Sequence, residues 1–380
     1  MNYEKTESHK LIRKEIRSFL KKELEPIVDE IDRDGIFPEV IFKDLMKLGY
    51  LSLILPEEYG GGGHDFFGTA IIAEELAKAC AGLYTSAFGH IFCQHWIDMF
   101  GTKEQKEKYL PELSEGNAIG AIAITEPDAG SNVAGILTSA REDGDDFILD
   151  GRKTFITNGS IADIICVVTV TEPDAKPRGI STLIVETKAP GFSAEKPMKK
   201  LGNRCSPTCE IVFENCRVPK ENLLGTRNKS LVETTRFFSF ERVAVAVACA
   251  GIAEAAMESA RDYARQRKQF GVPIATFQGI QEMLADMATD IYATRCMCED
   301  LLDHMEKGEY LVEKASMAKA FASEMVNRHT SNAIQIFGGY GYTAEFPVER
   351  YFRDARVFSI GGGTTQIQRR LIARSIIGKI

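Results

Sequence analysis

The sequence lacks several features, and each absence excludes a class of protein. No run in its 380 residues approaches 18 consecutive apolar positions, so we expect no membrane span. Residues 1–22 are rich in charge and contain no apolar stretch, unlike a secretory signal. Positive charge is not in excess either, because the net charge is −8 at pH 7. That balance argues against nonspecific binding to nucleic acid or to an anionic membrane.

Cysteine is present, but not in the pattern of a disulfide framework or a metal site. The nine cysteines are scattered singly, apart from the pairs Cys205/Cys209 and Cys296/Cys298. This distribution is typical of reduced thiols in a cytoplasmic protein. The Cys296–Cys298 pair has neither zinc-site spacing nor a second pair of ligands, so we predict no bound metal.

Sequence fingerprints for binding phosphate groups are missing as well. The glycine-rich segment 56–63 is not followed by Lys-Ser or Lys-Thr, so it is not a P-loop, and we expect a flexible connection there. No nicotinamide-binding glycine motif follows a predicted strand.

The residues that are present predict three regions that differ in secondary structure. Residues 1–120 have apolar side chains at helical spacing, first at Leu11, Ile12, Ile16, Phe19, Leu20 and Leu24. The pattern returns at 41–48 and at 67–81. A composition of 44% hydrophobic and 26% charged residues is ordinary for a globular chain of two or three domains.

Strand-like runs rich in β-branched residues begin near residue 120. We predict strands at 164–170, 179–186 and 209–213, and a surface turn at 172–179. Asp150-Gly151 lies between two such runs and predicts a hairpin turn. Long helices then return at 243–256, 283–302 and 311–337, the first of them with almost no polar face.

The predicted fold class is therefore α+β. It comprises an N-terminal α-helical domain (1–120), a middle β-sheet domain (121–228) and a C-terminal four-helix bundle (229–380).

Five motifs occur in order along this framework. They are Ile124-Thr125-Glu126-Pro127-Asp128-Ala129-Gly130-Ser131, Phe155-Ile156-Thr157-Asn158-Gly159, Arg267-Lys268-Gln269-Phe270-Gly271, Gln335-Ile336-Phe337-Gly338-Gly339-Tyr340-Gly341 and Thr364-Thr365-Gln366-Ile367-Gln368. With these motifs the chain resembles the acyl-CoA dehydrogenases over essentially its whole length. The resemblance implies FAD held between the β domain and the C-terminal bundle, and a homotetramer built as a dimer of dimers.

The same resemblance implies which residues hold the FAD. They are Thr125, Ser131, Phe155, Thr157, Arg267, Gln269, Phe270, Gln335, Gly338, Gly339, Thr364 and Gln366. In the family, positions such as Thr125 and Thr157 meet the isoalloxazine, Phe155 packs against it, and Arg267 reaches the pyrophosphate of a neighbouring subunit. Each has a plainer alternative: Thr157 and Ser131 as turn or cap residues, Phe155 as core, and Arg267 as a cation at a helix C-terminus.

Position 362 departs from the family pattern. Many acyl-CoA dehydrogenases carry a catalytic glutamate where this chain has Gly362, and glycine has no group that takes a proton. The main-chain N–H of Gly362 can still hold the thioester oxygen, as the family implies. The resemblance places Ser131, Phe238, Arg242 and Gly362 at the substrate.

Glu241 is the replacement candidate for the base. A subset of the family, including the isovaleryl-CoA and long-chain enzymes, carries its base at this helix position, and an apolar setting would raise the pKa of the carboxyl toward neutrality. The alternative is an exposed glutamate in a first helical turn, or one paired with Arg242.

Three functional hypotheses follow. The first is FAD-dependent dehydrogenation of a short, branched or alicyclic acyl-CoA, with electron-transferring flavoprotein as the partner that accepts electrons. The second is an enoyl-CoA reductase running in reverse. The third is a flavin-binding protein that has lost its base. Phe237, Phe238 and Phe240 either wall a wide acyl pocket or are simply core.

Overall fold

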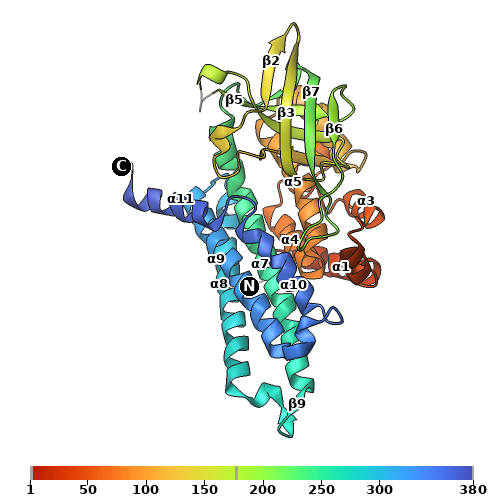
Figure 1. The fold of residues 1–380 in the computed structure, drawn as a ribbon, viewed down its shortest axis with the longest axis vertical. Helices are drawn as coiled ribbons and strands as arrows, with labels where there is room; N and C mark the ends of the chain where they lie inside the picture. Colours follow the sequence, from red (N-terminus) through yellow and green to blue (C-terminus); the bar gives the residue numbers. More distant parts are fainter. Residues whose placement is uncertain (1–2, 176–178, 379–380) are drawn as a thin grey trace.

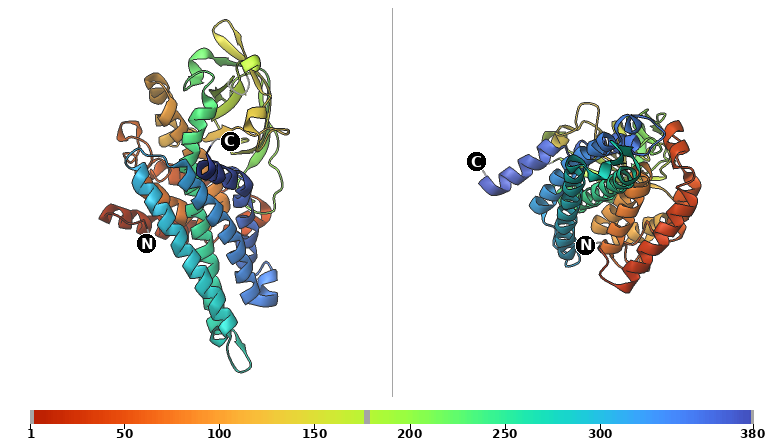
Figure 2. Two further views of the ribbon diagram at one scale, coloured as in Figure 1. Left: turned by 90° about the vertical axis from the view of Figure 1, so that its left-hand side faces the viewer. Right: turned by 90° about the horizontal axis from the view of Figure 1, so that it is seen from below.

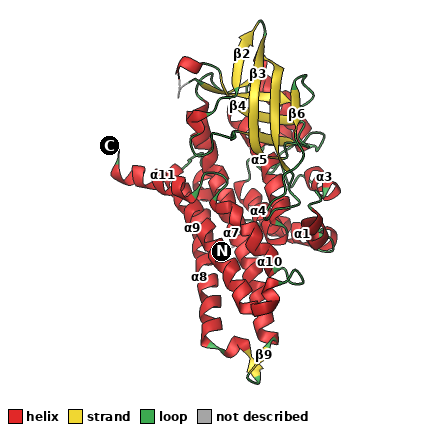
Figure 3. Cartoon of the chain, in the orientation of Figure 1, coloured by secondary structure: helices red, strands yellow, loops and turns green. Residues whose placement is uncertain are grey.

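Helices and sheet follow one another along the chain in the order predicted. The computed structural model describes residues 3–175 and 179–378, and Figure 1 shows a sheet at one end of a long bundle of helices. Residues 176–178 of the predicted surface turn lie outside the described part. Figure 3 separates the strands, gathered at that one end, from the helices that make up the rest.

The N-terminal region is helical, as expected. Its helices are α1 (Glu7–Glu23), α2 (Val28–Asp34), α3 (Glu39–Lys47), α4 (Phe66–Ala79), α5 (Ala81–Phe100) and α6 (Lys103–Ser114). The hydroxyl oxygen of Thr6 caps α1 by accepting from the N–H of His9, and Thr102 with Gln105 forms a capping box on α6. Helices α4 and α5 are buried along almost their whole length and so form the centre of this region.

The glycine-rich segment after Pro56 is a packed turn, which corrects the expectation of a flexible connection. The N–H of Gly63 donates to the carbonyl of Leu55, and a Cβ built on Gly61 would collide with the same carbonyl. Glycine is required there because two stretches of backbone approach each other directly.

The middle region is a mostly antiparallel sheet. Its strands are β1 (Gly120–Ala123), β2 (Ser139–Asp143), β3 (Asp146–Thr157), β4 (Ile164–Val170), β5 (Ile180–Glu186), β6 (Phe192–Ala194), β7 (Thr208–Pro219) and β8 (Leu223–Leu224). The order is β6-β7-β3-β2-β4-β5-β8, with β1 parallel to β4.

The hairpin predicted at Asp150-Gly151 is wrong. Strand β3 runs straight through both residues, and the register with β7 shifts between Leu149 and Gly151. Gly151 has φ +144, a conformation that serves a bulge rather than a turn. The turn lies one Asp-Gly pair earlier, because Asp143 of β2 pairs with Asp146 of β3 across Gly144 at φ +60.

The C-terminal region is a helical bundle. It contains α7 (Ser230–Gln266), α8 (Gln278–Met305), α9 (Val312–Phe337) and α10 (Val348–Ala355), with the short strands β9 (Lys268–Gln269) and β10 (Val272–Pro273) at the tip joining α7 to α8. Helix α11 (Thr365–Ile377) leaves the bundle sideways, as the views in Figure 2 make clear.

Helix α7 is the central element of the molecule. By length and composition alone it is apolar enough to cross a membrane, but 78% of its most apolar window is buried inside the molecule. It packs against α4, α8 and α9, and its alanines and valines allow those helices to approach closely. A helix that is apolar on most sides is what such a position requires.

Candidate active site

Glu241 lies on α7, in the first third of that helix. Its side chain is only 6% exposed, and its neighbours Phe240 and Val243 belong to the hydrophobic core. The alternative of an exposed first-turn glutamate is therefore wrong. The alternative of pairing with Arg242 is not supported either, because Oε2 of Glu241 and Nε and Nη1 of Arg242 have no hydrogen-bond partner among the described residues, and adjacent helix positions do not face each other.

Gly362 lies directly against that carboxyl group. A Cβ built on Gly362 would overlap Oε1 of Glu241 and stand 2.8 Å from its Cδ. The carboxyl group of Glu241 thus fills the space into which a side chain at 362 would extend. The structure brings together two residues that are 121 positions apart in the sequence.

The electrostatic setting of Glu241 favours the protonated form of its carboxyl group. Burial raises the pKa of Glu241 above its ordinary value, while the positive charges of Lys319 and Arg242 oppose that rise. Within the described residues, Oε2 of Glu241 and the Nε and Nη1 atoms of Arg242 have no hydrogen-bond partner. Buried polar atoms without partners at one place mark a site where a ligand is expected.

Two buried side chains grip the loop that carries Gly362. Lys319 on α9 donates from Nζ to the carbonyls of Gly361 (2.9 Å) and Gly363 (2.6 Å). Gln368 on α11 donates from Nε2 to the carbonyls of Gly362 and Gly363, both at 3.1 Å. Every carbonyl of the triple glycine is thus held from inside the protein.

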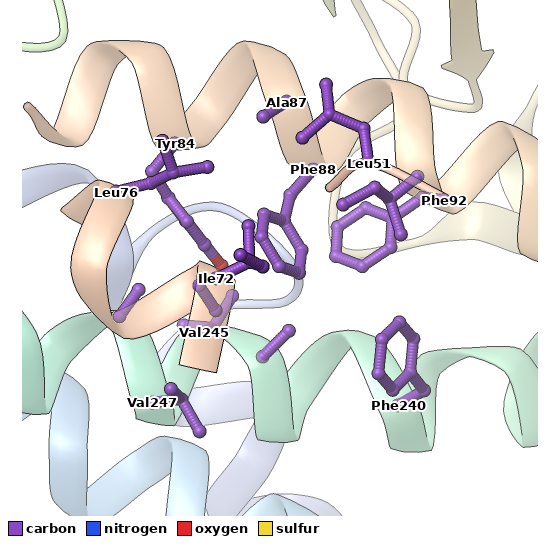
Figure 4. Close-up of a cluster of buried hydrophobic side chains, with 14 of the residues drawn as sticks. Leu51, Ile72, Leu76, Tyr84, Ala87, Phe88, Phe92, Phe240, Val245 and Val247 are labelled. Atoms are coloured by element: carbon purple, nitrogen blue, oxygen red, sulfur yellow. The ribbon is translucent and has the colours of Figure 1, made fainter. Parts of the chain in front are cut away.

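Aromatic rings from α5 and α7 lie next to this centre. Figure 4 shows Tyr84, Phe88 and Phe92 along α5, facing Phe240 of α7 across the core. Tyr84 stacks on Phe88 with ring centroids 4.6 Å apart, and its buried hydroxyl has no partner among the described residues. Burial, and secondarily the charge of Glu241, raises the pKa of Tyr84 well above its usual value.

The three phenylalanines that precede Glu241 differ in role. Phe237 is fully buried and stacked on Trp96, so for this residue the core alternative holds. Phe240 is buried against Phe66 and Phe92. Phe238 is only partly buried, and the guanidinium carbon of Arg242 lies 5.8 Å from its ring centroid.

The sheet presents a second group of predicted residues at one edge. Phe155 is 66% exposed with φ +58, and the register of β3 with β7 shifts around it. The core alternative for Phe155 is therefore wrong. An exposed ring on a backbone of this kind costs about 1–3 kcal/mol and points to a function.

The neighbouring threonines and serine occupy the connections around Phe155. Thr125 follows β1, and its carbonyl accepts from the N–H of Thr154. Thr157 ends β3, half-buried close to Gly89, where a Cβ would meet its methyl carbon at 3.1 Å. Ser131 is exposed in the loop after Ala129.

A cavity of about 590 Å³ lies at the far end of the bundle. Its lining includes Arg267, Gln269, Gly338 and Gly339, and the guanidinium of Arg267 lies 5.7 Å from the ring centroid of Tyr340. Of the other residues assigned to FAD, Phe270 is 94% exposed, and Gln335 and Gln366 are also exposed. The hydroxyl of Thr364 caps α11 by accepting from the N–H of Ile367.

The Arg267 cavity and the Glu241 centre of one chain are far apart. Glu241 and Arg267 are 26 positions apart along α7 and its C-terminal end, which corresponds to about 39 Å at the rise of a helix. Figure 1 shows β9 at the opposite end of the bundle from the sheet. The residues assigned to FAD therefore fall into two groups within one chain, one around Phe155 at the edge of the sheet and one around Arg267 at the far end of the bundle.

Three residues at the centre were not found from the sequence. Lys319 lies at core spacing with Ala315, Ala318 and Ala322, and a lysine at a core position is a signal that could have revealed it. Gln368 lies at the end of the fifth motif, but no role was assigned to it, and Tyr84 carries no comparable signal in the sequence.

Comparison with known families covers almost the whole chain. Three family models match, described as the N-terminal domain (residues 6–117), the middle domain (121–216) and the C-terminal domain (232–377) of acyl-CoA dehydrogenase.

Individual relatives match over the same extent. A 3-(aryl)acrylate reductase from Clostridium sporogenes is 42% identical across 98% of this chain and 99% of its own length. The CarC subunit of a caffeyl-CoA reductase–Etf complex from Acetobacterium woodii is 39% identical across 98% and 99%. The solved butyryl-CoA dehydrogenase of Megasphaera elsdenii superimposes with a TM-score of 0.96 at 37% identity, covering 99% of this chain and all of that one.

Proposed function

Because this chain belongs to the acyl-CoA dehydrogenase family of oxidoreductases acting on CH–CH bonds, we propose that it is an FAD-dependent enzyme in which Glu241 is the base. The observation that carries the proposal is the overlap of the Glu241 carboxyl with the side-chain position of Gly362. Burial that raises the pKa of this carboxyl supports the same role.

Each group has a defined task in dehydrogenation of an acyl-CoA thioester. Glu241 removes a proton from the α carbon, and the N–H of Gly362 donates to the thioester oxygen as negative charge develops there. Bound FAD supplies the acceptor for the hydride that leaves the β carbon. Two C–H bonds break and a C=C bond forms. The buried rings and the apolar face of α7 exclude water from the carboxyl.

The proposed acyl group is short, branched or alicyclic. Gly361, Gly362 and Gly363 contribute no side chains beside Glu241, and a Cβ on Gly361 would meet only Val357, at 3.7 Å or more. This leaves width near the reacting carbons, while the packed rings of Tyr84, Phe88 and Phe92 limit depth. A wide site also suits an aryl group, which the name of the C. sporogenes relative specifies.

A second candidate function is the reverse reaction, reduction of an enoyl-CoA. It is favoured by two relatives whose names describe reductases, one of them as part of an Etf complex. In this direction Glu241 donates the proton to the α carbon, by microscopic reversibility. We propose electron-transferring flavoprotein as the electron partner in either direction.

We also propose the larger organisation that the site requires. The separation of the two halves of the FAD site along α7 supports an oligomer, which we propose to be a homotetramer formed as a dimer of dimers. Domain boundaries near 120/121 and 228/229 fit the change from helix to sheet and back.

The test is an anaerobic titration of the FAD-loaded protein with straight, branched, alicyclic and aryl acyl-CoAs, followed by loss of flavin absorbance. Wild type should bleach with at least one short or wide acyl group, and Glu241→Gln should bleach about 10²–10⁴ times more slowly. Equal rates for the two proteins would remove Glu241 as the base. Bleaching of neither protein by any acyl-CoA would favour a flavin-binding protein without this activity.

A further inference from the structure

We propose that Lys319 and Gln368 are positioning residues, which hold the loop Gly361–Gly363 so that the N–H of Gly362 and the carboxyl of Glu241 face the same substrate atoms. The inference rests on the proposed function and adds to it the groups that build its oxyanion site. Lys319 lies outside the five motifs, and Gln368, which ends the fifth motif, was given no role there.

The first support is the geometry of the peptide between Gly361 and Gly362. Its carbonyl accepts from Nζ of Lys319 at 2.9 Å. In a planar trans peptide the C=O and the N–H point in opposite directions. Lys319 therefore fixes the N–H of Gly362 on the side away from α9, and its charge polarises the same amide, which makes it a stronger donor.

The second support is that the loop could not hold this shape alone. Gly362 and Gly363 adopt φ +62 and +83, and three consecutive glycines have more conformational freedom to lose than any other tripeptide. The donors from Lys319 and Gln368 occupy all three carbonyls from inside the protein. Both side chains are fully buried, so water does not replace them.

The third support is charge. The charged and titratable groups that face Glu241 are Lys319 from α9 and Arg242 from α7 itself, with the hydroxyl of Tyr84 from α5. Burial lowers the pKa of Lys319. Glu241 and the thiol of Cys249 oppose this shift, and the charge of Arg242 adds to it. An ammonium group placed among alanines is costly unless it acts on a neighbouring charge or dipole.

Three single variants separate the effect of holding the glycine loop from the effect of the Lys319 charge on Glu241. Lys319→Met removes a donor and a charge at similar volume, and Gln368→Met removes a donor only. Lys314→Met is the control, because Lys314 lies on the same helix but is exposed and paired with Asp300. The readouts are kcat, KM, the pH at which the rate is half-maximal, and binding of an alkyl-CoA thioether, which has no carbonyl for Gly362 to hold.

We expect Lys319→Met to lower kcat about 10²–10³-fold with a smaller change in KM, as for loss of an oxyanion donor. Its rate profile for dehydrogenation should also move to higher pH, since a positive charge near Glu241 is gone. Gln368→Met should lower kcat without moving the profile. Both variants should bind the thioether as wild type does, and Lys314→Met should change nothing.

The inference is overturned if Lys319→Met and Gln368→Met keep kcat within about threefold of wild type, or if the thioether and the thioester lose affinity equally. Should Lys319→Met fail to fold, Gln368→Met and its thioether binding decide the question alone. A wild-type protein inactive on every acyl-CoA would instead reject the proposed function, and this outcome is distinct because it needs no variant.

Discussion

The Glu241 centre and the Arg267 cavity are built in opposite ways. The first is buried, its loop carbonyls are all held by side chains of the same chain, and its unpartnered atoms converge on one place. The second is open, has Arg267, Gln269, Gly338 and Gly339 as exposed lining residues, and lies at the other end of the bundle. If the proposed function holds, this contrast means that one chain supplies all the groups for proton transfer but only part of the FAD site.

The largest expected effect comes from moving the carboxyl group from position 241 to position 362. Glu241→Gly should abolish most turnover, and the double variant Glu241→Gly/Gly362→Glu should recover part of it, because the two side chains compete for one space. Recovery should be incomplete, since a glutamate at φ +62 costs about 1–3 kcal/mol of strain. Steady-state rates of the three proteins measure this.

The proposed role of the Glu241 centre would be contradicted if the double variant turned over no faster than Glu241→Gly while both proteins still bound FAD. That result would mean that the two positions do not serve the same substrate atom.

The pH dependence should have opposite signs in the two directions of reaction. Burial raises the pKa of Glu241, and dehydrogenation needs the carboxylate, so its rate should fall as pH falls through that pKa, about tenfold per unit below it. Enoyl-CoA reduction needs the protonated acid, so its rate should fall as pH rises through the same pKa. Initial rates in both directions across a pH series check the sign, and identical profiles would contradict it.

A smaller effect is expected at the open cavity. Arg267→Met should weaken FAD retention about 10–100-fold, the value of one charge-assisted hydrogen bond, without altering kcat of fully loaded protein. Arg265→Met is the matched control, because Arg265 lies in the last turn of α7 outside the cavity. Equilibrium dialysis measures the affinity of both variants for FAD. A lower kcat in FAD-loaded Arg267→Met would show that the cavity also affects the chemistry at the Glu241 centre.

The smallest effect concerns the exposed ring on the sheet. Phe155→Gly should raise the free energy of unfolding of the FAD-free protein by about 1 kcal/mol, because glycine tolerates φ +58. The same variant should bind FAD less tightly. Denaturant unfolding with and without FAD measures both effects. If Phe155→Gly destabilised the FAD-free protein, the ring of Phe155 would be packing within the protein rather than contacting FAD.

Apolar patterning and runs of β-branched residues were enough to predict the order of the three regions. The segment 243–256 was predicted as a helix from its near-absence of polar residues, and the structure extends this helix, α7, to Ser230–Gln266. It was not enough for Asp150-Gly151, since a bulge and a turn both need glycine and only pairing with β7 distinguishes them.

At the site, the sequence offered Glu241 and Gly362 as partners only through family resemblance. Their contact depends on how α7 meets the loop before α11, which no local pattern encodes. Lys319 was missed for the same reason: its partners are main-chain carbonyls more than 40 residues away.

The most direct test of the central claim is exchange of the α proton of a bound acyl-CoA with D₂O, followed by NMR or mass spectrometry. The account predicts rapid deuterium incorporation by wild type, a loss of at least about 10² in Glu241→Gln, and partial return in Glu241→Gly/Gly362→Glu. Exchange by Glu241→Gln at the wild-type rate would contradict it, since another group would then be taking the proton.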